Sequence, residues 1–163
     1  MKTVIVYCSM YGTTEKASHL LADWLEGEVE IVDLKENPDF ELRDYDSIII
    51  GGSIHSGTIQ PRVTIWMKKH RDILLTKKIG LFLCCWHDGF TALDQFNAAF
   101  PEEFREKSIA NGIFGGELPI SKMGFIEKQI AEYISGVTTD TSHLDLTAIM
   151  SFAKKSNQTI ALV

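Results

Sequence analysis

The fold is decided by an apolar run, Thr3-Val4-Ile5-Val6-Tyr7-Cys8, that leads directly into the hydroxyl-rich turn Ser9-Met10-Tyr11-Gly12-Thr13-Thr14. The run is typical of a buried strand, and an amphipathic helix follows the turn. Because the first N–H groups of a helix have no intrahelical partner and the helix dipole favours negative charge, such a turn binds phosphate. Hydroxyl residues also cap helices that bind no ligand, so the turn alone leaves both interpretations open.

Strands and helices alternate along the rest of the chain. Further strands are predicted at residues 29–33, 46–51, 79–85 and 108–115, and helices at residues 61–74, 93–100, 122–134 and 146–155. This alternation predicts an α/β fold, a single domain over residues 1–163 in which helices cover both faces of a five-stranded parallel sheet.

Folds of this class bind ligands at the carboxyl ends of their strands. The loops after the first, third and fourth predicted strands are therefore expected to meet, at residues 9–14, 52–60 and 85–89. The second loop contributes the candidates Ser53, Ile54, His55, Ser56 and Gly57, and the third contributes Cys85, Trp86, His87, Asp88 and Gly89.

This chain lacks the residues that three other classes of α/β protein require. The first turn has one glycine, Gly12, where dinucleotide-binding folds have G-x-G-x-x-G, and no G-x-x-x-x-G-K-[ST] string exists. Phosphoacceptor receiver domains need acidic residues after the first strand and an aspartate after the third. The chain instead has Cys8-Ser9 and Gly51-Gly52-Ser53 at those places.

Amino-acid composition limits the classes of partner and the cellular compartment that we expect for this protein. The net charge of −6 argues against nucleic acid as a partner. The three cysteines form no disulfide framework, which indicates a reducing, cytoplasmic location, and the absence of Cys-x-x-Cys spacing argues against a metal site. No apolar run predicts a signal peptide or an integral membrane segment, which leaves peripheral association open.

The three loops together resemble the flavodoxin-like FMN-binding family. Ser9-x-Tyr11-Gly12-x-Thr14 is similar to that family's phosphate loop, and the second and third loops stand where its flavin loops belong. The resemblance covers nearly the whole chain and implies a three-layer sandwich with strand order 2-1-3-4-5. It also implies non-covalent FMN and electron transfer with a redox partner protein or a small-molecule electron donor or acceptor.

Gly52-Ser53-Ile54-His55-Ser56-Gly57 and Gly136-Val137-Thr138-Thr139-Asp140-Thr141 look closest to the branch of menaquinone-dependent protoporphyrinogen dehydrogenases. Those enzymes carry a long basic insertion after the fourth strand, whereas only Thr91 to Lys107 stands there in this acidic chain. Electron transfer through FMN is therefore the first hypothesis and protoporphyrinogen IX or quinone oxidoreduction the second. A binding protein without flavin is the third.

The resemblance also implies roles for individual residues. Ser9, Met10, Tyr11, Gly12, Thr13 and Thr14 would hold the phosphate through N–H and hydroxyl groups. Trp86 would lie against the isoalloxazine ring, with a core position as the alternative. Asp88 would lie near the pyrimidine end of the ring or else cap the next helix. His55 and His87 are candidates to relay a proton to reduced flavin, with plain solvent exposure as the alternative.

Overall fold

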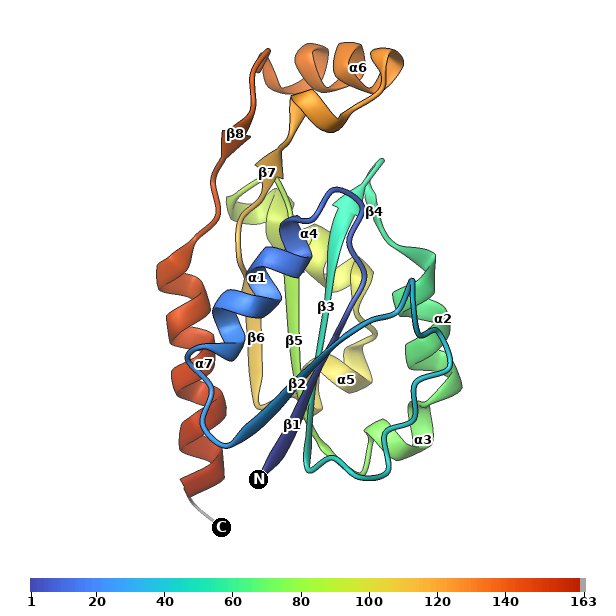
Figure 1. Cartoon of the computed structure of the whole chain (residues 1–163), viewed down its shortest axis with the longest axis vertical. Coiled ribbons are helices and arrows are strands. Elements are labelled where there is room, and N and C mark those ends of the chain that lie inside the picture. Colours follow the sequence, from blue (N-terminus) through green and yellow to red (C-terminus); the bar gives the residue numbers. More distant parts are fainter. Residues whose placement is uncertain (162–163) are drawn as a thin grey trace.

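The central sheet of the protein is parallel and five strands wide. The computed structural model describes residues 1–161. The sheet contains β1 (Lys2–Tyr7), β2 (Glu28–Asp33), β3 (Ser47–His55), β5 (Lys78–Cys84) and β6 (Ala110–Ile113). The order β2-β1-β3-β5-β6 confirms the predicted 2-1-3-4-5, because β4 (Thr58–Ile59) only adds an antiparallel pair to β3 (Figure 1).

The inner strands β1, β3 and β5 form because their apolar side chains are buried on both faces of the sheet. Successive residues of a strand point to opposite faces, and along β3 Ile48 and Ile50 belong to one core cluster while Ile49 belongs to the other. All three side chains are fully buried. A continuous apolar run therefore supplies two cores at once.

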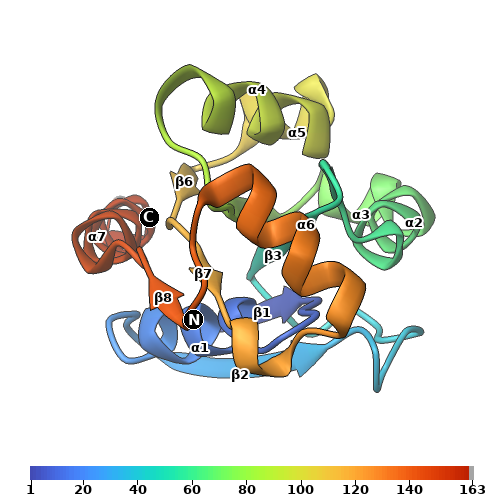
Figure 2. The same cartoon turned by 90° about the horizontal axis from the view of Figure 1, so that it is seen from above.

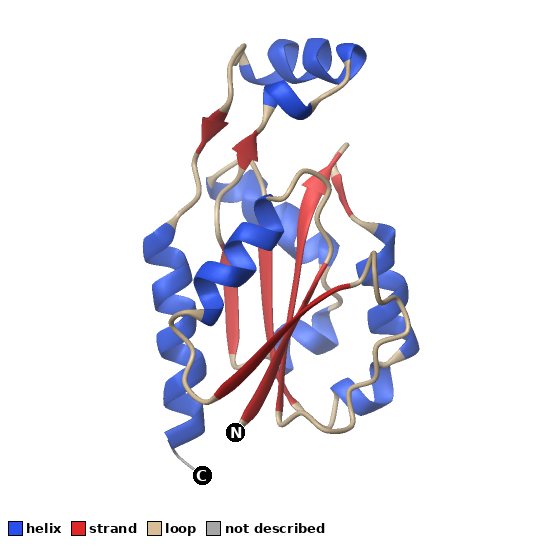
Figure 3. Ribbon diagram, viewed as in Figure 1, coloured by secondary structure: helices blue, strands red, loops and turns tan. Residues whose placement is uncertain are grey.

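Helices cover both faces of the sheet, as Figure 3 shows. Residues of α1 (Thr13–Ala22) and α7 (Leu146–Ala161) pack into one core cluster. Residues of the helices on the other face pack into the second cluster: α2 (Pro61–Lys69), α3 (Arg71–Leu74) and α4 (Gly89–Ala99), with Phe104 from α5 (Glu102–Lys107). The three-layer α/β sandwich expected from the resemblance is confirmed. No helix within residues 1–161 is long and apolar enough to cross a bilayer.

Several predicted boundaries differ from the structure. The predicted helix at residues 61–74 is divided at His70, whose φ of −102° and ψ of 14° interrupt the helix. The segment predicted as a loop at residues 52–60 is mostly a β-hairpin, because β3 continues to His55 and pairs with β4. Ser56 and Gly57 form its turn with φ of 50° and 83°, the left-handed conformations that a two-residue hairpin turn requires.

The helix predicted at residues 122–134 was expected to cover the sheet, and that expectation is wrong. The segment at residues 117–142, here called the cap, contains β7 (Glu117–Leu118), η1 (Ile120–Lys122), α6 (Phe125–Ser135) and β8 (Thr141–Ser142). Helix α6 buries none of its residues and lies across the carboxyl ends of the strands, as the view from above shows (Figures 1 and 2). Apolar residues at helical spacing predict an amphipathic helix, but not the surface that it meets.

The cap leaves and rejoins the fold at neighbouring points. Its two strands pair antiparallel, and the His143 N–H donates to the Gly116 carbonyl at 2.8 Å. A Cβ on Gly115, whose φ is 73°, would lie 2.0 Å from the His143 carbonyl oxygen. The glycine therefore allows the outgoing and returning chains to pass in contact.

Candidate functional site

Three connections meet at the carboxyl edge of the sheet, beneath α6 (Figure 2). The first follows β1 and leads into α1, the second is the β3–β4 hairpin, and the third follows β5 and leads into α4. Tyr11, His55 and Trp86, one from each connection, line the same chamber. The parallel arrangement of β1, β3 and β5 therefore brings together the segments that sequence analysis singled out.

The loop between β1 and α1 is built to receive an anion. Gly12 turns the chain with φ of 98°, and its N–H donates to Ser9 Oγ at 2.9 Å. No side chain among the described residues caps the N-terminus of α1, so its first N–H groups remain directed at the loop. The Thr14 hydroxyl is fully buried and makes no hydrogen bond within residues 1–161 that meets normal geometry. A buried hydroxyl beside free helix N–H groups fits a phosphate, which accepts several hydrogen bonds.

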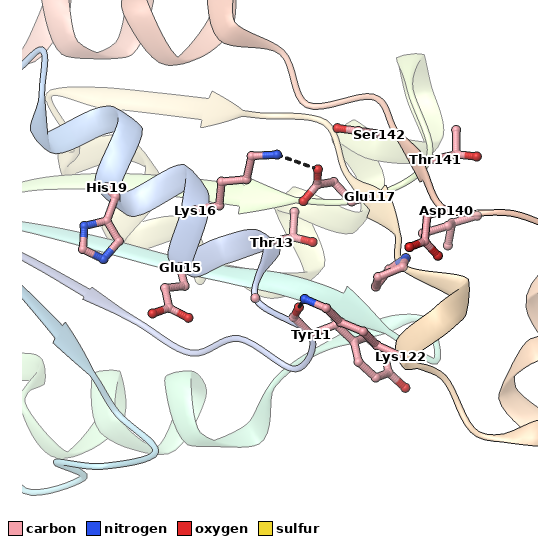
Figure 4. Close-up of a pocket in the computed structure, with 13 residues that line it drawn as sticks. Tyr11, Thr13, Glu15, Lys16, His19, Glu117, Lys122, Asp140, Thr141 and Ser142 are labelled. Carbon is pink, nitrogen blue, oxygen red and sulfur yellow. Dashed lines mark hydrogen bonds and ion pairs between the residues drawn. The ribbon is translucent and has the colours of Figure 1, made fainter.

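A polar groove of about 600 Å³ lies between this loop and the cap (Figure 4). The Lys16 ammonium donates to Glu117 Oε2 at 2.9 Å. Burial alone would raise the pKa of Glu117, but hydrogen bonds from Lys16 and Ser142 outweigh burial and lower it. The nearby Thr13 hydroxyl also contributes to the lowered pKa of this carboxylate.

A more apolar chamber of about 380 Å³ adjoins the groove at Tyr11. The hairpin and the segment after β5 form its sides, and Met123, Ile130 and Ile134 of the cap also line it. Gln95 of α4 is a further lining residue, and its Oε1 atom is buried without a partner among the described residues. An apolar chamber with a few polar groups is typical of a cofactor site, and this volume lies within the range of about 300–1,000 Å³ for such sites.

Aromatic rings flank the chamber on two sides. Trp86 stacks on His143 with ring centroids 4.3 Å apart and planes inclined by 17°. Because Trp86 also lines the chamber, His143 holds the indole from behind. Tyr11 meets the His55 ring edge-on at 6.0 Å. These contacts fix the rings between which a flat aromatic ligand would lie.

The sixteen predicted site residues fall into four groups by position. Seven line the chamber: Tyr11, Ile54, His55, Ser56, Gly57, Trp86 and His87. Four form the anion loop with Tyr11: Ser9, Gly12, Thr13 and Thr14. Two lie next to chamber residues in sequence without lining the chamber: Ser53, which is hydrogen-bonded to Gln60, and Cys85, which is buried. The last three do not line the chamber: Met10 is 46% exposed, and Asp88 and Gly89 lie at the start of α4.

The cysteines beside the site are structural. Burial raises the pKa of Cys84 to about 12 and that of Cys85 to about 11. Burial also raises the pKa of Cys8. Thiolates are the nucleophilic form, so burial disfavours reaction at these thiols.

Sequence reasoning missed the contributions of Gln95 and the cap. The helical period of residues 125–135 was visible, but nothing local in the sequence indicated that Ile130 and Ile134 line the site. The pair Gly115-Gly116, directly after a strand, was the available signal for a segment that leaves the sheet.

The fold and the geometry at the carboxyl edge of the sheet fit an α/β protein with room for an anionic, aromatic ligand. Comparison with known families agrees, since the flavodoxin domain family matches residues 4–145. A curated relative, Protoporphyrinogen IX dehydrogenase [quinone] of Leishmania major, is 24% identical over 172 residues, covering 93% of this chain and 73% of the relative.

Two solved structures share the fold. Oxidised flavodoxin 1 of Bacillus cereus has a TM-score of 0.58 and 21% identity, with 95% of this chain and 96% of the flavodoxin covered. The rubredoxin oxygen:oxidoreductase of Desulfovibrio gigas has a TM-score of 0.63 and 16% identity. That match covers 99% of this chain but 36% of the longer protein.

The chain belongs to the flavodoxin domain family. It is accordingly a flavodoxin-like redox protein that binds FMN without a covalent bond and transfers electrons through it.

Proposed function

We propose that residues 9–14 bind the FMN phosphate and that the isoalloxazine ring lies in the chamber beneath α6. The observation that carries this assignment is the buried, unpartnered Thr14 hydroxyl at the uncapped N-terminus of α1. The loop adjoins a chamber of suitable size and polarity, since Tyr11 lines both the groove and the chamber. FMN itself supplies the redox chemistry, and the protein sets its exposure and its access to partners.

The chain's own residues orient the ring and exclude water. Trp86, backed by His143, and the hairpin line the chamber and would hold the ring there. Gly57 has φ of 83° and an added Cβ there would meet nothing within 4 Å, so this turn is an open wall of the chamber. Ile130 and Ile134 shield the chamber from solvent. His55 and His87 line the chamber and are the histidines that would move a proton there.

A second candidate function is two-electron oxidation of protoporphyrinogen IX or a quinone reaction. Two observations favour it: the curated relative bears that activity in its name, and α6 covers the chamber in which the ring would lie. A covered ring suits a small substrate that enters the chamber, whereas a protein partner reaches an exposed ring edge more easily.

The proposal places the protein in the cytoplasm, because its three cysteines are buried and unpaired. Its partner is a redox protein or a small-molecule electron donor or acceptor. The exposed apolar side of α6, with Phe125 and Tyr133, leaves peripheral membrane association open.

The test begins with FMN titration of the apoprotein, followed by anaerobic reduction monitored by visible absorbance. Saturable binding at one FMN per chain is expected, and no binding would refute the assignment in favour of a binding protein without flavin. Reduction in two separate one-electron steps supports a carrier. Reduction in a single two-electron step, with turnover of protoporphyrinogen and a menaquinone analogue, supports the second candidate.

A further inference from the structure

Two lysines line the groove beside the phosphate loop, and they differ in their partners. Lys16 is neutralised by Glu117 at 2.9 Å. Lys122, carried by the cap, donates from Nζ to the Tyr11 carbonyl at 3.2 Å. Within residues 1–161 no carboxylate lies within 4.0 Å of Lys122 Nζ, so its charge is not neutralised by an ion pair.

We propose that Lys122 is a phosphate-binding residue supplied by the cap, and that the FMN phosphate thereby holds the cap closed over the chamber. The inference rests on the proposed position of FMN. It assigns to Lys122 a role that neither the phosphate-loop pattern nor the family match assigns, because Lys122 lies far from residues 9–14 in sequence.

The position of Lys122 supports this role. Its Nζ lies 3.9 Å from the point at which a Gly12 Cβ would be, so the ammonium is next to the turn of the loop. Its present acceptor is a neutral carbonyl. A hydrogen bond from an ammonium to a phosphate is charge-assisted and about twice as strong as a bond between neutral groups. A phosphate in the loop is therefore the stronger partner for Lys122.

Two of the three acidic residues that line the groove, Glu117 and Asp140, are already engaged, and the third is Glu15. Glu117 is paired with Lys16, and Asp140 accepts hydrogen bonds from the Ser121 N–H and hydroxyl, each at 2.7 Å. These carboxylates still repel an incoming phosphate. The backbone N–H groups of the loop offset only part of the repulsion between these carboxylates and a phosphate. The ammonium of Lys122, which has no carboxylate partner among the described residues, would offset more of it.

The same contact connects the loop to the helix over the chamber. Lys122 ends η1, just before α6, and the Tyr11 hydroxyl donates to Glu127 in the first turn of α6. Tyr11 therefore contacts the cap through both its carbonyl and its hydroxyl. Fixing Lys122 on a phosphate also fixes the start of α6, whose Ile130 lines the chamber.

The first test compares FMN with riboflavin, which lacks the phosphate. The apoprotein, Lys122→Gln and the control Lys128→Gln are titrated with each flavin. Lys128 also lies on the cap and loses the same charge, but it does not line the groove. Lys122→Gln is expected to weaken FMN binding about tenfold and to leave riboflavin binding within about twofold, with Lys128→Gln changing neither. Equal losses for both flavins, or unchanged FMN affinity, would overturn the proposal.

The second test measures hydrogen exchange of cap amides at residues 119–139. FMN is expected to slow this exchange more than riboflavin does, and Lys122→Gln is expected to abolish the difference. Equal protection by both flavins in the unaltered protein would show that the phosphate does not hold the cap. If the unaltered protein binds no FMN, the position of FMN itself is refuted, a result distinct from failure of the lysine contact.

Discussion

Replacing Thr14 with valine separates ligand binding from folding, because the two effects have opposite signs. Valine keeps the shape of threonine and removes a hydroxyl that is fully buried and unpartnered. A buried hydroxyl without a partner costs about 1–3 kcal/mol. The neighbouring Cys84 thiol interacts weakly with this hydroxyl, so the lower end applies. We expect the free energy of unfolding of the apoprotein to rise by about 1 kcal/mol.

The same substitution removes a donor to the phosphate. A hydrogen bond to a charged group contributes about 1.5–3 kcal/mol, so FMN affinity is expected to fall roughly 10- to 100-fold. Urea unfolding of the apoprotein measures the first effect, and quenching of FMN fluorescence during titration measures the second.

Ser18→Ala is the matched control. Ser18 is equally buried in α1, but its hydroxyl donates to the Thr14 carbonyl at 2.8 Å. Its removal is expected to destabilise the apoprotein by about 1 kcal/mol and to leave FMN affinity unchanged. The reasoning is refuted if Thr14→Val destabilises the apoprotein as Ser18→Ala does, or if FMN affinity stays the same.

Three further predictions concern the surroundings of the site. Gly115→Ala is expected to destabilise the fold by roughly 2 kcal/mol or more in urea unfolding, because the new Cβ would meet the His143 carbonyl at 2.0 Å; Gly124→Ala, where a Cβ meets nothing within 4 Å, should change little. Since the folded-state pKa of Glu117 is lowered, its stabilising contribution is present above the ordinary pKa of 4.5 and is lost as pH falls through the folded value. In the Glu117→Gln variant, the free energy of unfolding should therefore change less with pH over this acidic range. Cys84 and Cys85 should react with a thiol reagent at pH 8 only after denaturation, and rapid labelling of the native protein would contradict their raised pKa values.

Local signals made the core of the fold predictable. The run from Val4 to Val6 and the run from Ile48 to Ile50 are apolar at every position, which is typical of a strand buried on both faces. The turn at Gly12 was predictable because it directly follows the first of these apolar runs. These features depend on neighbours in sequence, and sequence patterns report such neighbours directly.

The cap and the division of the site between two pockets were not predictable in that way. Ile126, Ile130 and Tyr133 have the spacing of a core-facing helix, yet they are 70%, 54% and 92% exposed. Their position depends on where the chain leaves the sheet, which is set by close backbone approaches at Gly115 and Gly116. The hairpin was nearer to being predictable, because the pair Ser56-Gly57 is a turn signal between apolar segments.

The adjacent ends of the cap have a consequence for how this protein diversifies. The chain departs at Gly116 and returns at His143, with those two residues hydrogen-bonded to each other, so everything between them is an insertion at a single point. Such a segment can be exchanged or resized without altering the register of any strand of the central sheet. Evolution or an engineer can therefore change the segment that covers the chamber while leaving the central sheet as it is.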